Sequence, residues 1–193
     1  KSKNKPKSLI DTFYYPEYGS GLIYETIAQK IKEKGYTVLL NTEPISIKRN
    51  EKKITSVRAK NGEQEIVFEF DHLVETVPLP FFTKLLFPQS PKKITDISAG
   101  LSYRSQVYIF ITLDKEKVTD DQWIYIPEKH FHIGRISEMK NFSLKMSPEG
   151  KTSLFLEIFC FENDHIWNMD DTEVFELALK ELIQLGFITK EEV

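Results

Sequence analysis

Two stretches of the chain place apolar residues at the spacing of a helix. Residues 20–34 carry isoleucine at every fourth position, with mostly polar residues on the other faces, a pattern typical of an amphipathic helix. Ser20 is suited to begin this helix and Gly35 to end it. Near the C-terminus, Asp170 is followed three positions later by Glu173 and then by an apolar stripe, which predicts a second, capped helix.

Between these helices, short runs that alternate apolar and polar residues are typical of strands with one buried face. The dipeptide Asn61-Gly62 between two such runs favours a tight hairpin. Strands are expected at residues 36–40, 45–49, 54–60, 65–70, 71–76, 103–113, 123–126, 131–137 and 153–161. A short helix is expected at residues 81–87, closed by Pro88. The sequence therefore predicts an α+β fold, with a mixed, largely antiparallel sheet flanked by helices.

The composition is that of a folded globular chain. Its 193 residues are 40% hydrophobic and 12% aromatic, which is enough to bury one large core or two small ones. A proline-containing break at residues 88–98 indicates a soft boundary between two parts of the chain.

Charge and cysteine content narrow the class of protein. The net charge of −3 argues against nucleic-acid binding, which depends on neutralising phosphates. No apolar run approaches the roughly 18 residues that a membrane span requires. The single cysteine, Cys160, lies in an apolar run and is expected to be buried. Because one cysteine permits no internal disulfide, a reducing, cytoplasmic location is expected.

Two short patterns favour no site. Gly19-x-Gly21 lacks the third glycine and the preceding strand of a dinucleotide-binding loop. His130-x-His132 places two imidazoles on one face of a strand, but no Cys, Asp or Glu cluster with ligand spacing accompanies them. We therefore predict neither a phosphate-binding loop nor a metal site.

Two arginines beside apolar residues are stronger candidates for ligand binding. Arg104 follows Tyr103 where one strand begins, and Arg135 lies near the end of another. A buried, unpaired guanidinium is costly, so three arrangements remain open. The arginines are exposed, or Arg135 pairs with Glu138 or another acid, or they face an anionic ligand, for which arginine is well suited.

Several short motifs follow one another along residues 15–157. They are Y-P-x-x-G-x-G-L, N-T-E-P-I, D-H-L-V-E-T-V-P-L, Y-R-S-Q-V-Y-I-F-I-T-L-D, R-I-S-E-M-K-N-F-S and P-E-G-K-T-S-L-F-L-E. In this order the chain resembles the FAD-dependent amine oxidase superfamily, and within it protoporphyrinogen oxidase-like and UDP-galactopyranose mutase-like flavoproteins. The resemblance implies the substrate-binding region of an FAD-linked reductase-type fold, acting on a small-molecule substrate that carries an anionic group.

The resemblance also implies two functional segments along the chain. Residues 1–90 match a segment of the FAD domain, with its helix, β-meander and adenine-side strand, and residues 91–193 match the substrate-binding sheet and the C-terminal helix. By the same resemblance, the residues near the adenine side of FAD or at the cofactor's strand end are Pro44, Ile45, Thr76, Val77 and Pro78.

On the substrate side, the implied binding residues are Tyr103, Arg104, Arg135 and Glu138. Many amine oxidases carry a lysine in the strand that matches residues 103–113, and this strand has none. The catalytic residues are therefore left open, and amine oxidation itself is not implied.

The start of the chain bears on how much of such an enzyme it contains. It opens at Lys1 without an initiator Met, and it shows neither the G-x-G-x-x-G start nor the C-terminal flavin-contacting segment of the superfamily. We expect a fragment of a larger FAD-dependent oxidoreductase that does not hold FAD by itself. The alternatives are a fragment of a UDP-galactopyranose mutase-like flavoenzyme and a stand-alone ligand-binding module.

Overall fold

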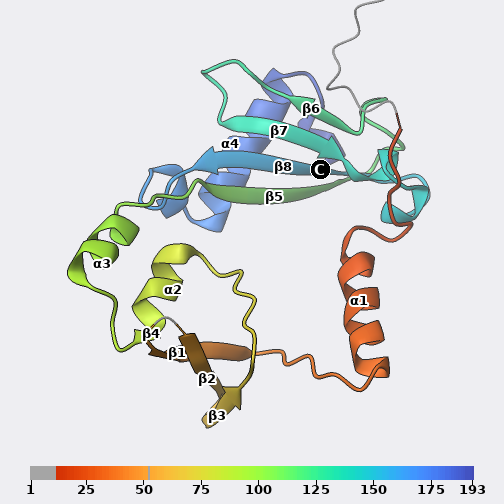
Figure 1. Cartoon of the computed structure of the whole chain (residues 1–193). Helices are drawn as coiled ribbons and strands as arrows, with labels where there is room; N and C mark the ends of the chain where they lie inside the picture. The colour runs from red at the N-terminus through yellow and green to blue at the C-terminus, as the bar shows by residue number, and fades with distance from the viewer. Residues whose placement is uncertain (1–11, 52) are drawn as a thin grey trace, which may run out of the picture. The chain divides into compact units, whose positions relative to one another are not determined.

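The computed structural model describes residues 12–51 and 53–193. The chain divides into two compact units, whose elements are labelled in Figure 1. The central unit comprises residues 31–103, and the terminal unit comprises the described residues up to 30 together with residues 104–193. The helix α1 (Gly21–Glu33) begins in the terminal unit, and its last residues belong to the central one.

The terminal unit is built on a four-stranded antiparallel sheet with the strand order β5-β8-β7-β6. In β5, Ile109, Ile111 and Leu113 are buried while the residues between them are exposed, because successive side chains of a strand point to opposite faces. The strands are β5 (Ser105–Leu113), β6 (Trp123–Tyr125), β7 (Ile133–Glu138) and β8 (Thr152–Cys160).

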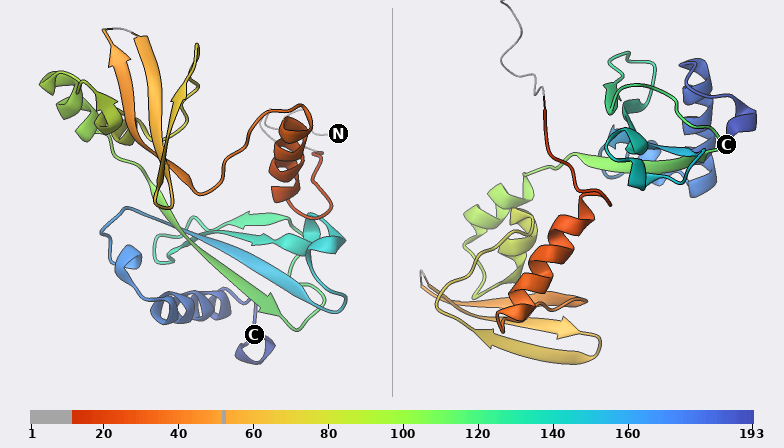
Figure 2. Two further views of the ribbon diagram at one scale, coloured as in Figure 1. Left: turned by 90° about the horizontal axis from the view of Figure 1, so that it is seen from below. Right: turned by 90° about the vertical axis from the view of Figure 1, so that its right-hand side faces the viewer.

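One face of this sheet is covered by the helix α4 (Asp171–Gln184), as Figures 1 and 2 show. Its buried Ala178 and Leu182 join the apolar core that the inner side chains of β5, β7 and β8 form. The predicted capping box is present. The backbone N–H of Glu173 donates to the Asp170 carboxylate over 2.9 Å, and the N–H of Asp170 donates to the Glu173 carboxylate over 3.0 Å.

Aromatic side chains attach the N-terminal segment of the terminal unit to its sheet. The ring centroid of Phe13 lies 5.8 Å from that of Trp123, and the Tyr15 ring lies 4.8 Å from Phe142. The 3-10 helices of this unit are Met139–Asn141, Leu144–Met146, Ile166–Asn168 and Lys190–Glu192.

The central unit contains a second four-stranded sheet with the order β3-β2-β1-β4. Its first three strands form an antiparallel meander, and the hairpin turn at Gly62 has a positive φ of 58°, which glycine adopts without strain. The short β4 pairs with β1 in parallel. The elements are β1 (Thr42–Asn50), β2 (Lys53–Asn61), β3 (Gln64–Glu69), α2 (Leu79–Leu85), β4 (Leu86–Phe87) and α3 (Lys92–Ala99).

Side-chain hydrogen bonds join the two helices of the central unit and hold the segment between them against the sheet. The hydroxyls of Thr83 and Ser98 share a hydrogen bond of 2.7 Å that joins α2 to α3. The Arg49 guanidinium of β1 donates to the carbonyls of Pro88 and Gln89 over 2.8 and 3.0 Å, which fixes the segment after β4 against the sheet.

Two expectations about local structure are wrong. Residues 36–40 and 71–76 do not form strands. Their apolar side chains are largely exposed, Val74 to 88%, and in the described part of the chain no strand pairs with them. The soft boundary expected at residues 88–98 stays a prediction, and this stretch contains α3, which begins directly after Pro91.

The short helix predicted at residues 81–87 forms two residues earlier and ends at Leu85, so that Leu86 and Phe87 are free to pair as β4. The predicted α+β class with largely antiparallel pairing is confirmed, with two sheets. The functional division at residue 90 stays a prediction, whereas the compact units meet at residues 30/31 and 103/104. Among the described helices, none combines the length and apolarity needed to cross a bilayer.

Candidate functional site

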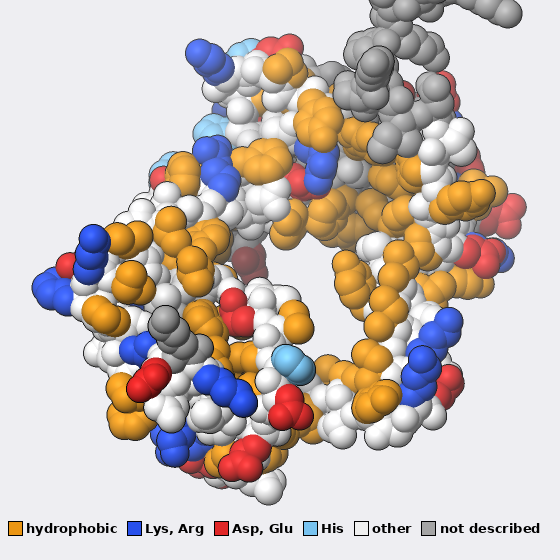
Figure 3. All heavy atoms as spheres, in the orientation of Figure 1, with side chains coloured by type: hydrophobic (Ala, Val, Ile, Leu, Met, Phe, Trp, Pro, Cys, Tyr) orange, Lys and Arg blue, Asp and Glu red, His pale blue; other side chains and the backbone are white. Residues whose placement is uncertain are grey.

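The first candidate site is the face of the terminal sheet that points away from α4, which we call the open face. The register places side chains of all four strands in two rows across it. The first row consists of three aromatic side chains and one serine, and the second consists of polar side chains and tyrosines. Members of the first row are Phe110, Phe155, Ser137 and Trp123, and members of the second are Tyr108, Glu157, Arg135 and Tyr125. This face is turned toward the viewer in Figure 3, where hydrophobic side chains gather over the strands.

The polar row is joined by hydrogen bonds that converge on Glu157. The Arg135 guanidinium donates through Nε to Glu157 Oε1 over 2.7 Å and through a second nitrogen to the same oxygen. Gln106 Nε2 donates to the other carboxylate oxygen over 3.1 Å, and the Tyr108 hydroxyl donates to Gln106. Arg135 also donates to the Tyr125 hydroxyl over 3.3 Å, and its guanidinium carbon lies 5.7 Å from the centre of that ring.

Arg135 and Glu157 form an ion pair whose two side chains differ in solvent exposure. The Glu157 side chain is 4% exposed, whereas that of Arg135 is 35% exposed. Partial burial opposes the charged form of Arg135, but the hydrogen bonds to Glu157 and Tyr125 outweigh it and raise its pKa. The guanidinium charge is therefore balanced by the protein, and the pair offers an edge of N–H donors rather than a free cation.

Arg104 is placed differently. One of its nitrogens donates to the Phe159 carbonyl over 3.2 Å, and its guanidinium carbon lies 4.8 Å from the centre of the Phe161 ring. Among the described residues it has no carboxylate partner, and it lies just after the exposed Tyr103, where β5 begins. Its charge is thus free to meet an anion at the end of the open face.

Glycine shapes the open face at one position. A Cβ added to Gly134 would lie 2.6 Å from Cδ2 of Phe159, closer than real side chains approach. The register of β7 against β8 shifts at this residue, as at a β-bulge. The absent side chain therefore lets the Phe159 ring lie across β7.

Glu138, predicted as a substrate-binding residue, is fully buried. Its carboxylate accepts from the backbone N–H groups of Val118 and Thr119 over 2.9 and 2.7 Å, and from the Thr152 hydroxyl over 2.7 Å. It holds the segment after β5 against the core rather than reaching the open face. The acid that does pair with Arg135 is Glu157, and the sequence contained a signal for it. A lone carboxylate inside an apolar strand needs a partner.

The pair His130 and His132 shows no metal-binding arrangement in the described structure. His132 Nδ1 lies 2.7 Å from the buried Glu181 carboxylate of α4, which also accepts the backbone N–H groups of His132 and Ile133. In the described ranges no three His, Cys, Asp or Glu side chains come together as a metal-binding group. His132 and Glu181 serve to fasten α4 to the start of β7.

The second candidate site is a hollow of about 730 Å³ in the central unit. It brings together two of the predicted cofactor-binding residues, Pro44 and Val77, with Phe81 completing an apolar wall. Polar groups of Asn41, Thr42, Glu43 and Lys60 surround this wall. The predicted Thr76 and Pro78 flank Val77 outside the lining, and Ile45 lies at a register shift between Pro44 and Ser46.

The residues of this hollow fit one end of a dinucleotide. An apolar wall with hydrogen-bonding groups at its rim suits a planar heteroaromatic ring. In the adjoining segment, Oε1 of Glu75 is buried and has no hydrogen-bond partner within the described structure. A buried acceptor of this kind is short of one donor, although Glu75 does not itself line the hollow.

The overall fold is shared with solved structures of redox and sugar-converting enzymes. A reduced UDP-galactopyranose mutase matches with a TM-score of 0.75 and 23% identity, covering 93% of this chain and 38% of the other. A protoporphyrinogen oxidase-like protein from Exiguobacterium sp. 255-15 matches with a TM-score of 0.66 and 17% identity, covering 90% and 37%. Putrescine oxidase bound to putrescine matches with a TM-score of 0.61 and 12% identity, covering 90% and 36%.

These similarities confirm, at the level of the fold, the predicted resemblance to the FAD-dependent amine oxidase superfamily. The chain spans less than two fifths of the length of each of these three proteins. No protein-family model matches the chain, and no curated protein sequence matches it.

Proposed function

We propose that the chain is part of an FAD-dependent oxidoreductase and contributes the substrate-binding sheet together with the adenine-side hollow. The observation that carries this proposal is the open face, where aromatic rings surround an internally neutralised polar row, on a fold shared with flavoenzymes over about nine tenths of the chain. Aromatic surface with a few oriented polar groups is the usual lining of a small-molecule site.

In this proposal the central hollow holds the adenine end of FAD. Pro44 and Val77 pack against the ring, with Ile45 supporting Pro44 and with Thr76 and Pro78 fixing the backbone on either side of Val77. FAD, when bound, supplies the group that accepts a hydride from the substrate. The chain's own residues then bind and orient the substrate.

On the substrate side, Arg104 is the residue that meets an anionic group, because its charge has no carboxylate partner among the described residues. Arg135 orients the substrate through the N–H edge that Glu157 leaves exposed, and the exposed Tyr103, which directly precedes Arg104 in the chain, is proposed as a further substrate contact. In this proposal Glu138 does not contact the substrate, and it holds in place the segment that follows β5. We propose no lysine-dependent step, since β5 contains no lysine.

The second candidate function is that of a UDP-galactopyranose mutase-like flavoenzyme. It is favoured by the TM-score of 0.75 with such an enzyme and by the presence of two arginines on or beside the open face. In that case the arginines would hold a diphosphate, which arginine binds with good geometry.

Two assays test these functions. In a flavin-loaded protein that contains this chain, an oxidoreductase loses flavin absorbance when substrate is added without oxygen. A mutase instead isomerises a nucleotide sugar after prior reduction and leaves the flavin spectrum unchanged over the reaction. Failure of both assays across amines, porphyrinogens and nucleotide sugars would contradict the proposal.

The isolated chain provides a separate check on the cofactor assignment. We expect the 193-residue chain to fold but to bind FAD weakly and purify colourless, because the hollow contacts only the adenine end and no phosphate-binding loop is predicted. A stoichiometric yellow flavin spectrum on this chain would contradict that assignment.

A further inference from the structure

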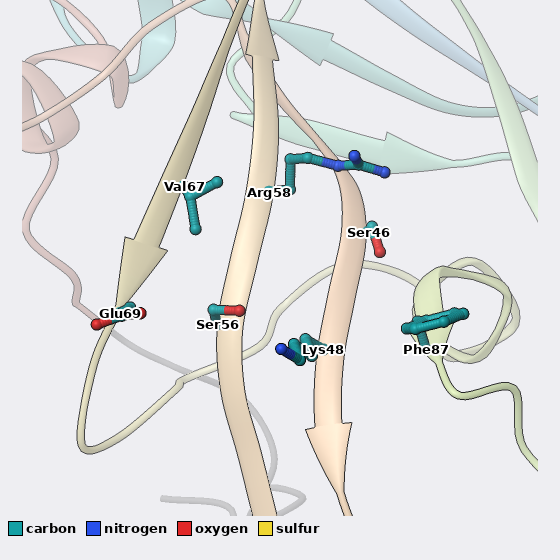
Figure 4. A pocket seen from close by; sticks show the side chains of 7 residues that line it. All are labelled: Ser46, Lys48, Ser56, Arg58, Val67, Glu69 and Phe87. Carbon is teal, nitrogen blue, oxygen red and sulfur yellow. The ribbon is translucent and has the colours of Figure 1, made fainter.

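The central sheet carries a further hollow that the proposed function does not use. It has a volume of about 550 Å³ and is lined by two side chains from each of β1, β2 and β3, and by Phe87 of β4. Figure 4 shows these side chains on one side of the sheet. Its residues and those of the adenine-side hollow do not overlap.

On this side of β1 and β2, each strand contributes one cationic side chain and one serine, and each cation lies opposite a serine of the other strand. Ser46 lies directly opposite Arg58, and Lys48 lies directly opposite Ser56. Opposite residues of an antiparallel pair have Cβ atoms about 4.5–5.5 Å apart, so the long side chains of Lys48 and Arg58 can turn toward one anion beside the two serines. Figure 4 shows the Arg58 guanidinium extending toward β1 and the Lys48 ammonium directed toward β2.

These donors are largely unused by the protein. Within the described structure, the Lys48 ammonium and the hydroxyls of Ser46 and Ser56 have no hydrogen-bond or ion-pair partner. Arg58 has one carboxylate neighbour, Glu65, at 3.7 Å, and both side chains are about half exposed. A surface pair at that distance contributes little, so a better-placed anion can displace it.

The remaining lining residues restrict the organic group that can carry such an anion. Val67 and Phe87 are exposed apolar side chains on two edges of the hollow. Glu69, with Glu65 on the same strand, keeps negative charge away from β3. The charged group must therefore lie over β1 and β2, with its organic part against the edge that Phe87 forms beside β1. The chain's net charge of −3 gives no general attraction for anions.

We propose that this hollow binds a small organic phosphate. Its phosphate group accepts from Lys48, Arg58 and the two serine hydroxyls, and its apolar or aromatic body packs on Phe87, which lies beside Lys48. Arginine, lysine and hydroxyl donors are the side chains best suited to phosphate oxygens. The site is independent of flavin binding and of the open face.

The test is a titration of the isotopically labelled 193-residue chain with phenyl phosphate, followed in amide ¹H–¹⁵N spectra. We expect saturable shifts concentrated in β1 and β2. Lys48→Ala and Arg58→Ala should each raise the dissociation constant about tenfold. The matched control is Lys93→Ala, which removes one exposed positive charge from α3 of the same unit.

A second ligand tests the apolar wall. Inorganic phosphate should bind more weakly than phenyl phosphate, and Phe87→Ala should abolish that difference while leaving the affinity for inorganic phosphate unchanged. Unchanged spectral dispersion in each variant shows that it remains folded. Shifts that do not saturate, or equal weakening by Lys93→Ala and Lys48→Ala, would show that phosphate meets only general surface charge and would overturn the proposal.

Discussion

Truncating Arg135 to alanine removes the cation of the open face and leaves Glu157 behind it. In the intact protein this carboxylate is 4% exposed and accepts from two nitrogens of Arg135 and from Gln106. After truncation, Gln106 is its only remaining donor among these. A sheltered carboxylate that loses its counter-charge loses most of the interaction that offset its desolvation.

The expected magnitude follows from how exposed the pair is. Breaking a fully buried pair destabilises a protein by about 3–5 kcal/mol, and an exposed pair contributes about 0–1 kcal/mol. Because the Arg135 side chain is 35% exposed and Glu157 is not, we expect Arg135→Ala to lower the unfolding free energy by about 2 kcal/mol. For a chain of this length, that corresponds to a fall in Tm of about 4–8 °C.

The assay is thermal and urea unfolding of four variants of the chain. Arg104→Ala is the matched control, since it also removes a guanidinium from the start of the same sheet but breaks no ion pair seen in the described structure. It should change the unfolding free energy by less than about 0.5 kcal/mol. Glu157→Gln and the double variant Arg135→Ala/Glu157→Gln complete a double-mutant cycle.

The double variant should be no less stable than Arg135→Ala alone, because the glutamine leaves no unpaired charge. A coupling free energy near zero, or equal losses for Arg135→Ala and Arg104→Ala, would refute the reasoning. It would mean that the ion pair contributes nothing that solvent does not replace.

Three further outcomes can be checked on single variants. Ile45→Asp should weaken FAD retention in a flavin-loaded protein by a few kcal/mol, about 2 or more, because a charge loses solvation beside the adenine-side hollow; the exposed Ile97→Asp serves as its control, and unchanged flavin occupancy after dialysis would contradict the assignment. Burial, with Asp164 nearby, raises the pKa of the Cys160 thiol, so a thiol reagent should label it only after unfolding in guanidinium, and fast labelling of the folded chain would contradict its burial. The hydrogen bond from Lys140 lowers the pKa of Glu116, so its stabilising effect is present above the carboxyl group's ordinary pKa and is lost as the pH falls through the lowered value; Glu116→Gln should therefore differ from the parent in urea unfolding at neutral pH and not in strong acid, and a difference that persists in acid would count against this ion pair.

The sequence alone determined those elements that depend on interactions between residues a few positions apart. The amphipathic spacing in α1, the capping box of α4 and the Asn61-Gly62 turn each depend on a few neighbouring residues, and each forms as predicted. The strand predicted at residues 103–113 also forms, as β5 over Ser105–Leu113. The fold class follows from these elements.

Only the tertiary structure decided which extended segments become strands and which charges pair. Residues 36–40 and 71–76 are as apolar as true strands, but no strand lies beside them in the described structure, and a strand exists only through its neighbour. Likewise, Arg135 and Glu157 are 22 residues apart in the chain and meet because β7 pairs with β8 in one register. That register depends on the shift at Gly134, and a one-residue slip would turn one partner to the opposite face.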